Sequence, residues 1–222
     1  AGIDSGISAE GNINMLQRLV VHRPARLGEA LTVKGEIKSV TAVPRGQRVE
    51  TDVWFEDLAG ERVISCPRTS LRPQAQGQSK SGAGDKPQPV VGDVAALLLR
   101  HTYQLTPDRV KSYSVEGNSI HYEQEAAERA GFRAPLIGGG MGVHYLTAQM
   151  WQDRRPSFFD VSIYFRRPIF WDEAVQVGVI EDGGNWSGMG LLKLPLVAER
   201  VGTSSEVAKV GTELSIADYR LA

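Results

Sequence analysis

Residues 167–177, "RPIFWDEAVQV", match residues 23–33, "RPARLGEALTV", at a constant offset of 144 positions. Arg, Pro, Glu, Ala and Val recur in step in the two segments. Strand-like sequence precedes both, and segments in which Val, Ile, Thr and aromatic residues alternate with polar ones follow both. A pattern that recurs at one offset predicts a tandem repeat of a single structural unit.

The alternating segments predict a meander of antiparallel strands in each copy, because alternation gives a sheet one buried face and one solvated face. Turn sequences such as "LAGE" and "DGGN" separate the segments. In the first copy, the predicted strands are residues 32–40, 47–55 and 62–71. In the second copy, they are residues 175–182, 188–199 and 206–218.

A stretch rich in Gln, Ser, Gly and Pro, residues 72–93, lies between the copies and is typical of a flexible linker. We therefore expect an incomplete first copy over residues 1–75, a linker over 76–96 and a second copy over 97–222. The second copy has about 65 residues before its meander, whereas the first has at most 22. The first copy thus lacks its helix in this chain: either the helix is lost, or it lies outside the sequence.

Helices are predicted ahead of the second meander. Thr106-Pro107-Asp108 combines a capping hydroxyl, a proline in the first turn and an acid at the positive end of a helix, which we expect to end near residues 116–117. Ser119 is expected to cap a second helix over about 120–130. A third, mostly apolar helix should begin near residues 139–141 and run to about residue 151. Its core candidates are Met141, Tyr145, Leu146 and Met150.

The predicted helices and strand meanders together give an α+β plan, with antiparallel sheets wrapped on a central helix. The composition is that of a globular protein. Hydrophobic residues make up 41% and charged residues 23% of the chain. Lys plus Arg number 25 against 26 Asp plus Glu, so no net charge favours nucleic acid or an anionic membrane. The apolar run at 94–99 is too short to span a bilayer. The single cysteine, Cys66, excludes an internal disulfide, and with no visible secretory signal it favours the cytoplasm.

Glu116 and His121 are the candidate acid/base residues. Five positions on a continuous helix would turn their side chains well apart, but Gly117-Asn118 is a turn signal between them. If the chain bends there, a carboxylate and an imidazole could hold and polarise one water molecule. Asn118 could orient either group or serve only as a turn residue.

The glycine run after residue 137 supplies a complementary feature. Backbone N–H groups at a helix start, without side chains to shield them, can hold a developing oxyanion, and Gly139 and Gly140 are the candidates. A thioester carbonyl placed there would become more enolate-like. Water held by Glu116 and His121 could then add across an α,β double bond.

The segment "SVEGNSIHYEQEAAERAGFRAPLIGGGM", residues 114–141, resembles the signature of the MaoC-like, (R)-specific enoyl-CoA hydratases. Their pattern runs Ser-Gly-Asp-x-Asn-Pro-hydrophobic-His-x-Asp, then alanine, Gly-Phe, proline and Gly-Met. The chain departs from it at Val115, Glu116 and Ser119, and has one residue more between Pro135 and Gly140. The matching positions are Ser114, Asn118, Ile120, His121, Ala126, Gly131, Phe132, Pro135, Gly140 and Met141.

This resemblance implies a tandem, double-hotdog fold and reversible syn hydration of a trans-2-enoyl-CoA to a (R)-3-hydroxyacyl-CoA. It places the catalytic carboxylate and imidazole on Glu116 and His121, and the oxyanion N–H at or near Gly140. The partner is an acyl-CoA thioester, with Met141, Arg166 and Arg167 assigned to substrate binding. It implies no cofactor and no metal. A homodimer of double-hotdog chains is the expected assembly.

Alternatives stand beside these assignments. The chain could be a non-catalytic acyl-thioester-binding subunit, or, less favoured, a hotdog thioesterase, for which only Glu116 offers a hydrolytic base. Glu116 could be an acid at a helix end without a chemical role. Arg166 and Arg167 could contact a CoA phosphate or merely cover a strand edge, and His144 is expected to pack rather than react. The first copy should carry no second active site, because no equivalent of the Glu116–His121 pair lies in it.

Overall fold

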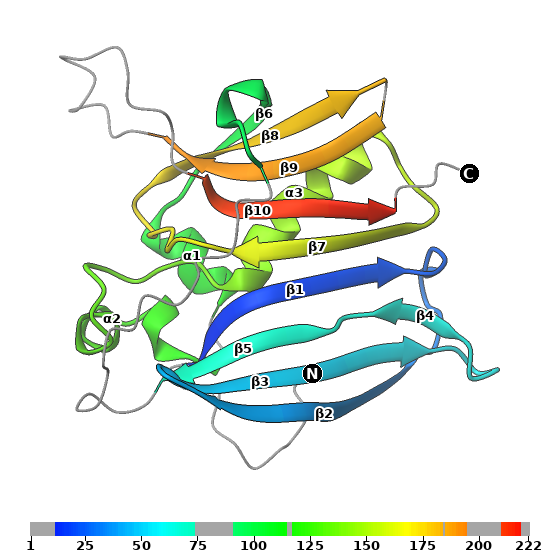
Figure 1. The fold of residues 1–222 in the computed structure, drawn as a ribbon, viewed down its shortest axis with the longest axis horizontal. Helices are drawn as coiled ribbons and strands as arrows, with labels where there is room; N and C mark the ends of the chain where they lie inside the picture. The colour runs from blue at the N-terminus through cyan, green and yellow to red at the C-terminus, as the bar shows by residue number, and fades with distance from the viewer. Residues whose placement is uncertain (1–11, 74–90, 115–116, 184, 195–209, 219–222) are drawn as a thin grey trace. The chain divides into compact units, whose positions relative to one another are not determined.

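The structure, a computed structural model, describes residues 12–73, 91–114, 117–183, 185–194 and 210–218. It is an α+β protein of antiparallel strands and few helices, as predicted (Figure 1). The chain divides into two compact units. The first comprises Ala1–Gln88, Pro156–Ile163 and Ile216–Ala222, and the second comprises Pro89–Arg155 and Tyr164–Ser215.

The first unit is an antiparallel sheet in the order β2-β3-β4-β1, and residues 159–163 of β7 lie next to β1. β5 also pairs with both β1 and β3. The predicted strand over 62–71 is two strands, β4 and β5, because Pro67 between them has no N–H to donate to a ladder. The strands of the first unit are β1 (Ile13–Val21), β2 (Thr32–Val43), β3 (Gly46–Glu56), β4 (Arg62–Ser65), β5 (Arg68–Pro73) and β7 (Phe159–Phe165).

The second unit has strands in the order β10-β9-β8-β6, and it holds the helices. The predicted turn at 182–185 joins β8 to β9, with Gly183 at a φ of +57°. The strands are β6 (Leu98–Gln104), β8 (Ala174–Asp182), β9 (Asn185–Lys193) and β10 (Val210–Asp218). The helices are α1 (Pro107–Tyr113), α2 (Gln124–Arg129) and α3 (Gly139–Asp153), with 3-10 turns η1 (Val94–Ala96) and η2 (Ser119–His121). Residues 195–199 and 206–209 of the predicted strands, and most of the predicted linker, lie outside the described residues.

The two units repeat one local geometry, as the matching segments predicted. Glu29 donates its N–H to the carbonyl of Arg26 at 3.0 Å and accepts the Arg26 N–H on its carboxylate at 2.9 Å. Glu173, 144 positions later, makes the same two bonds to Phe170, at 3.2 and 2.8 Å. The strand order β2-β3-β5 of the first copy likewise corresponds to β8-β9-β10 of the second.

The core of the second unit lies where α3 packs on β8 and β9 (Figure 1). All four predicted core residues of α3 are buried: Met141, Tyr145, Leu146 and Met150. The facing strand positions, Val177, Val179, Met189 and Leu191, have no exposed surface. Burying a side chain of this size is worth about 1.5–3 kcal/mol, so this contact fixes the position of the helix.

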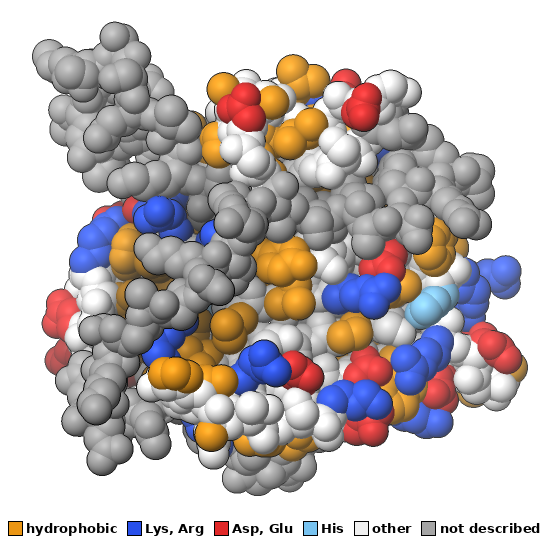
Figure 2. All heavy atoms as spheres, in the orientation of Figure 1, with side chains coloured by type: hydrophobic (Ala, Val, Ile, Leu, Met, Phe, Trp, Pro, Cys, Tyr) orange, Lys and Arg blue, Asp and Glu red, His pale blue; other side chains and the backbone are white. Residues whose placement is uncertain are grey.

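The described residues of the first unit include no helix. Val33, the counterpart of the fully buried Val177, is 43% exposed. Positive and negative side chains alternate over β2 and β3, where Lys34 pairs with Glu56 and Lys38 with Glu36 (Figure 2). None of the helices in the described part of the chain is long and apolar enough to cross a membrane.

Two predictions about the helices need correction. The first helix, α1, begins where predicted, with the Thr106 hydroxyl accepting the N–H of Arg109, but it ends at Tyr113. The predicted helix over 120–130 is not continuous: it consists of the 3-10 turn η2 and the short helix α2. Glu123, with φ −115° and ψ 121°, is extended and separates them. Asn118, rather than Ser119, precedes the first turn.

Candidate functional site

His121 lies in η2, and its ring is held by the loop that leads into α3. Its Nδ1 atom is 2.9 Å from the backbone oxygen of Leu136. A carbonyl oxygen only accepts hydrogen bonds, so Nδ1 carries the proton in this contact. In the neutral ring, Nε2 is then the acceptor and the basic atom.

The loop that carries Leu136 is itself tied at three points. The N–H of Leu136 donates to the carbonyl of Ile120 at 3.3 Å, which joins the loop to η2. The N–H of Ile137 donates to Ile169 at 2.9 Å, and that of Trp171 donates to Pro135 at 3.0 Å. The acceptor of the His121 ring is therefore part of a hydrogen-bonded frame, and the ring orientation follows from the backbone.

Gly138 brings the backbone next to the basic side of the His121 ring. A Cβ atom at this position would lie 3.8 Å from both Nε2 and Cδ2 of His121, and only 3.1 Å from Oγ of Ser114. The last distance is tighter than an ordinary van der Waals contact. Glycine is thus the residue that allows the loop to pass this close to the imidazole.

The first turn of α3 starts at the same place. Gly138 is the N-cap of the helix, and Gly139 and Gly140 are its first residues, as predicted. The N–H of Met141 donates to the carbonyl of Gly138 at 2.9 Å. The first N–H groups of an α-helix have no partner within the helix and point to its positive end, where they can bind an anion. The basic nitrogen of His121 and a helix start therefore meet at Gly138.

The other predicted site residues lie around this point in different ways. Asn118 is buried, with 7% of its surface exposed, and its carbonyl accepts the N–H of His121 at 3.2 Å. Met141 is buried in the first turn of α3. Arg166 is half-buried and Arg167 exposed, directly after β7. Glu116 lies outside the described residues, so its pairing with His121 stays a prediction. No group of three or more metal-binding side chains occurs among the described residues.

No model of a known protein family matches the sequence, and no curated protein matches it significantly. Solved structures do match: HtdX from Mycobacterium tuberculosis has a TM-score of 0.74 at 18% identity, over 97% of this chain and 80% of HtdX. A MaoC-like dehydratase from Phytophthora capsici has a TM-score of 0.62 at 19% identity, over 95% of this chain and 73% of that one. A Mycobacterium tuberculosis protein with a double hotdog fold has a TM-score of 0.57 at 12% identity, over 92% and 74%. The chain has the double-hotdog fold. The likeness confirms the predicted resemblance to MaoC-like proteins at the level of the fold.

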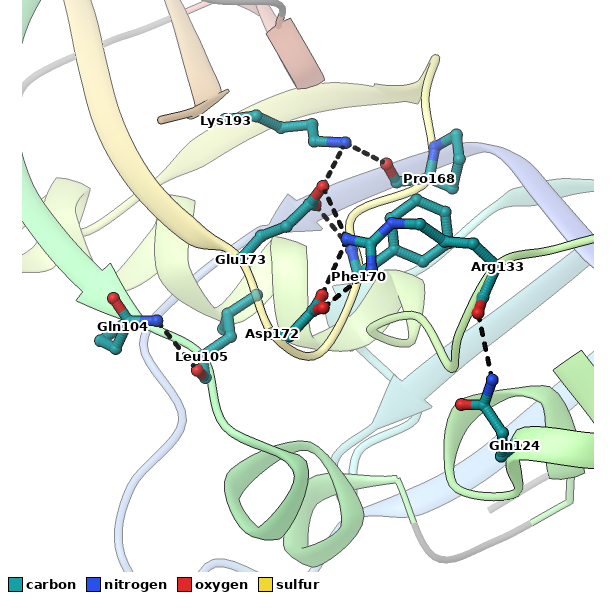
Figure 3. Close-up of polar contacts among 9 residues, drawn as sticks. All are labelled: Gln104, Leu105, Gln124, Arg133, Pro168, Phe170, Asp172, Glu173 and Lys193. Atoms are coloured by element: carbon teal, nitrogen blue, oxygen red, sulfur yellow. Dashed lines mark hydrogen bonds and ion pairs between the residues drawn. The ribbon is translucent and has the colours of Figure 1, made fainter. Parts of the chain in front are cut away.

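A cluster of charged side chains in the second hotdog copy anchors Arg133, at the start of the loop that carries Leu136 (Figure 3). The guanidinium of Arg133 lies 4.0 Å over the ring of Phe170 and donates to both carboxylate oxygens of Asp172 at 2.8 Å. It also donates to the buried Glu173 at 3.2 Å, which pairs with Lys193 at 2.7 Å. The hydrogen bond from Arg133 lowers the pKa of Asp172, so this pair stays ionised at neutral pH.

A cleft of about 820 Å³ opens beside the first turn of α3, between β6, α1 and α3 of the second hotdog copy. Met141 and Tyr145 reach it from α3, and Tyr113 from α1. His144, expected only to pack, is exposed and lines the cleft. Its position three residues after Met141 on the helix was the signal, because residues so spaced share a face.

Gly138 is the site residue that the sequence prediction missed. In a run of three glycines, the letters alone do not distinguish the N-cap from the first helical residues. The distinguishing fact is the contact with Ser114 and His121, which depends on how η2 folds back on the loop. Ser114 was noted only as a matching position, and the structure places its hydroxyl at this contact.

Proposed function

We propose that the protein is a hydro-lyase that adds water to a trans-2-enoyl-CoA to give a (R)-3-hydroxyacyl-CoA. The observation that carries this proposal is the approach of the basic His121 nitrogen to Gly138 at the start of α3. A base beside a helix N-terminus is what activation of water next to a polarised thioester requires. The MaoC-like fold and the motif over 114–141 support the same reaction.

In this reaction the thioester oxygen accepts hydrogen bonds from N–H groups at the start of α3, at Gly139 or Gly140. Electron density moves toward that oxygen, which makes C3 electrophilic. Water held by Glu116 and Nε2 of His121 gives up a proton as its oxygen bonds to C3. A proton is delivered to C2 on the same face, so the double bond becomes a C–O and a C–H bond and all atoms of water are retained.

Substrate binding completes the proposal. Arg167 is exposed and Arg166 is half-buried directly after β7. Guanidinium groups form charge-assisted hydrogen bonds with phosphate, so these two side chains are the proposed ligands of a CoA phosphate. Asn118 orients a catalytic group or the water. We also propose that the domain boundaries follow the repeat, that the enzyme works in the cytoplasm, and that two double-hotdog chains form a homodimer.

The test is turnover of enoyl-CoA thioesters of short, long and branched chains, followed by loss of the enone absorbance. His121→Ala should reduce turnover by at least about a hundredfold, the scale expected for a general base. His121→Asn should do the same while keeping an N–H donor near the Leu136 carbonyl, so a loss seen in both variants is not a folding defect. His22→Ala, in the first unit, is the matched control and should be fully active.

Two results would overturn the proposal. If no enoyl-CoA is hydrated but saturated acyl-CoA binds, the protein is an acyl-thioester-binding subunit. If free thiol is released from a saturated acyl-CoA, detected with a thiol reagent, it is a thioesterase. Both assays use the same protein preparation.

A further inference from the structure

The cleft beside α3 has an aromatic wall. Tyr103 and Tyr145 stack with ring centroids 4.0 Å apart, and His101 lies 4.5 Å from Tyr103. His144 continues the wall, 6.0 Å from Tyr145 and 6.1 Å from Tyr113. The three tilted contacts have the separations that aromatic pairs favour, so the wall presents surfaces that complement another flat ring.

The rest of the lining is polar except for Met141. Its polar members all have exposed side chains: Thr102, Gln104, Thr106, Arg109 and Ser112. A saturated hydrocarbon chain would remove water from these groups without giving them hydrogen bonds, which is unfavourable. The lining therefore suits a ligand that is flat and carries polar atoms.

One buried polar group of the cleft lining has an unused donor. The O–H of Tyr145 has no acceptor among the described residues, although Tyr145 is only 5% exposed. Burial raises the pKa of Tyr145, and the charge and hydrogen-bonding N–H groups of Arg109 oppose this rise. Arg109 is itself held by a bond from Nη1 to the carbonyl of Gln104 at 2.9 Å. An oxygen on a ligand could take the Tyr145 O–H and lie near this cation.

The cleft adjoins the start of α3. Met141, in the first turn, lines it, and a Cβ atom on Gly140 would lie 3.5 Å from Oη of Tyr113. A thioester held at Gly139 or Gly140 would therefore have the cleft within reach of its acyl group. The nucleotide of CoA lies at the far end of the pantetheine arm, so it is the acyl group that the position favours.

We propose that this cleft binds the distal part of the acyl group and selects a hydroxylated aromatic ring. The proposal rests on the proposed function, since that places the thioester at α3. The ring stacks along Tyr103, Tyr113 and His144, and its hydroxyl bonds to Tyr145. The substrate class is thus an aryl enoyl-CoA rather than a straight-chain one.

Equilibrium binding of saturated thioesters tests this without turnover, for example by calorimetry. The ligands are 3-(4-hydroxyphenyl)propanoyl-CoA, 3-phenylpropanoyl-CoA and octanoyl-CoA. We expect the hydroxylated ligand to bind about fivefold more tightly than the phenyl one, as one added hydrogen bond allows. Tyr145→Phe should erase that difference. Tyr113→Leu should weaken both aryl ligands by about threefold or more.

Tyr164→Phe is the matched control, because Tyr164 lies in β7 and does not line the cleft. Tightest binding of octanoyl-CoA would overturn the proposal. So would loss of binding of ADP or free CoA on Tyr113→Leu, which would make the cleft a nucleotide site. Aryl-selective binding by a protein that hydrates no enoyl-CoA would refute the hydro-lyase instead. Hydration without aryl preference would refute only the present inference.

Discussion

Glu116 carries one methylene more than the aspartate of the pattern that residues 114–141 resemble. If it is the base, its carboxylate must reach the same water as Nε2 of His121, and an error near an ångström is expensive in catalysis. Glu116→Gln keeps the size of the side chain and removes the basic oxygen. We expect turnover to fall by at least about a hundredfold. Glu116→Asp should also lose activity, because the loop with Val115 and Ser119 is adapted to the longer acid.

The same assay separates two roles for Glu116. If Glu116→Gln keeps most of the activity while His121→Ala is inactive, Glu116 is a structural acid and another group shares the proton transfer with His121. The hydratase would then stand and the assignment of the pair would be wrong.

Cys66 makes a residue-scale prediction about reactivity. Burial raises the pKa of its thiol to about 11, so the thiolate is scarce near neutral pH. Alkylation of the native protein by iodoacetamide at pH 8 should be slow and should accelerate in urea. The pKa of Cys66 is higher in the folded protein than in the unfolded chain, where it is near 9. Below pH 9 the thiol is protonated in both states, so its contribution to the free energy of unfolding does not change with pH. Stability should then fall as the pH rises toward 11, and Cys66→Ser should reduce that fall. Rapid labelling of the folded protein at pH 8 would contradict the assignment.

At the scale of elements, the sequence predicted best where a long periodic pattern is buried. α3 and its four core residues were found because apolar residues at helical spacing meet a sheet. The prediction of one helix over 120–130 was wrong because local propensity does not show that residues 122–123 interrupt it. That break sets the His121 ring on the Leu136 carbonyl, fifteen positions later, and this long-range bond is not encoded in short-range spacing.

Gly138→Ala adds one methyl group at the start of α3 and tests whether activity depends on the close approach of the loop to Ser114 and His121. In Gly138→Ala the new Cβ would press on Oγ of Ser114 at 3.1 Å and shift the loop by a few tenths of an ångström. We expect about a tenfold loss of turnover with a small change in melting temperature. Ser114→Ala removes the opposing oxygen, so the double variant should recover much of the loss. Gly92→Ala, where a Cβ meets nothing within 4 Å, is the control. Equal activity of Gly138→Ala and Gly92→Ala would remove Gly138 from the site.

At the scale of the whole molecule, the two copies share the turn and strand pattern of the repeat, and they differ in the helices and side chains that accompany it. The turns at Glu29 and Glu173 have the same bonds, which is why the repeat was readable from eleven residues. The helices, the cleft and His121 all belong to the second copy. Val33 is exposed where its counterpart Val177 is covered by the helix-bearing core. The repeat thus predicted the sheet of each copy, while the site depends on helices that, in the described part of the chain, lie in the second copy.

This asymmetry predicts the number of binding sites. A site of the proposed kind needs a base next to a helix start, and the described residues of the first unit include no helix. We therefore expect one molecule of a saturated acyl-CoA to bind per chain of 222 residues, measured by calorimetric titration with the protein concentration fixed by amino-acid analysis. His121→Asn should lose turnover and keep this stoichiometry, since the acyl group and CoA make their contacts elsewhere. Two equivalent sites per chain would mean that the sheet of the first copy binds a thioester without a helix, and the link between helix start and substrate would then fail for both copies.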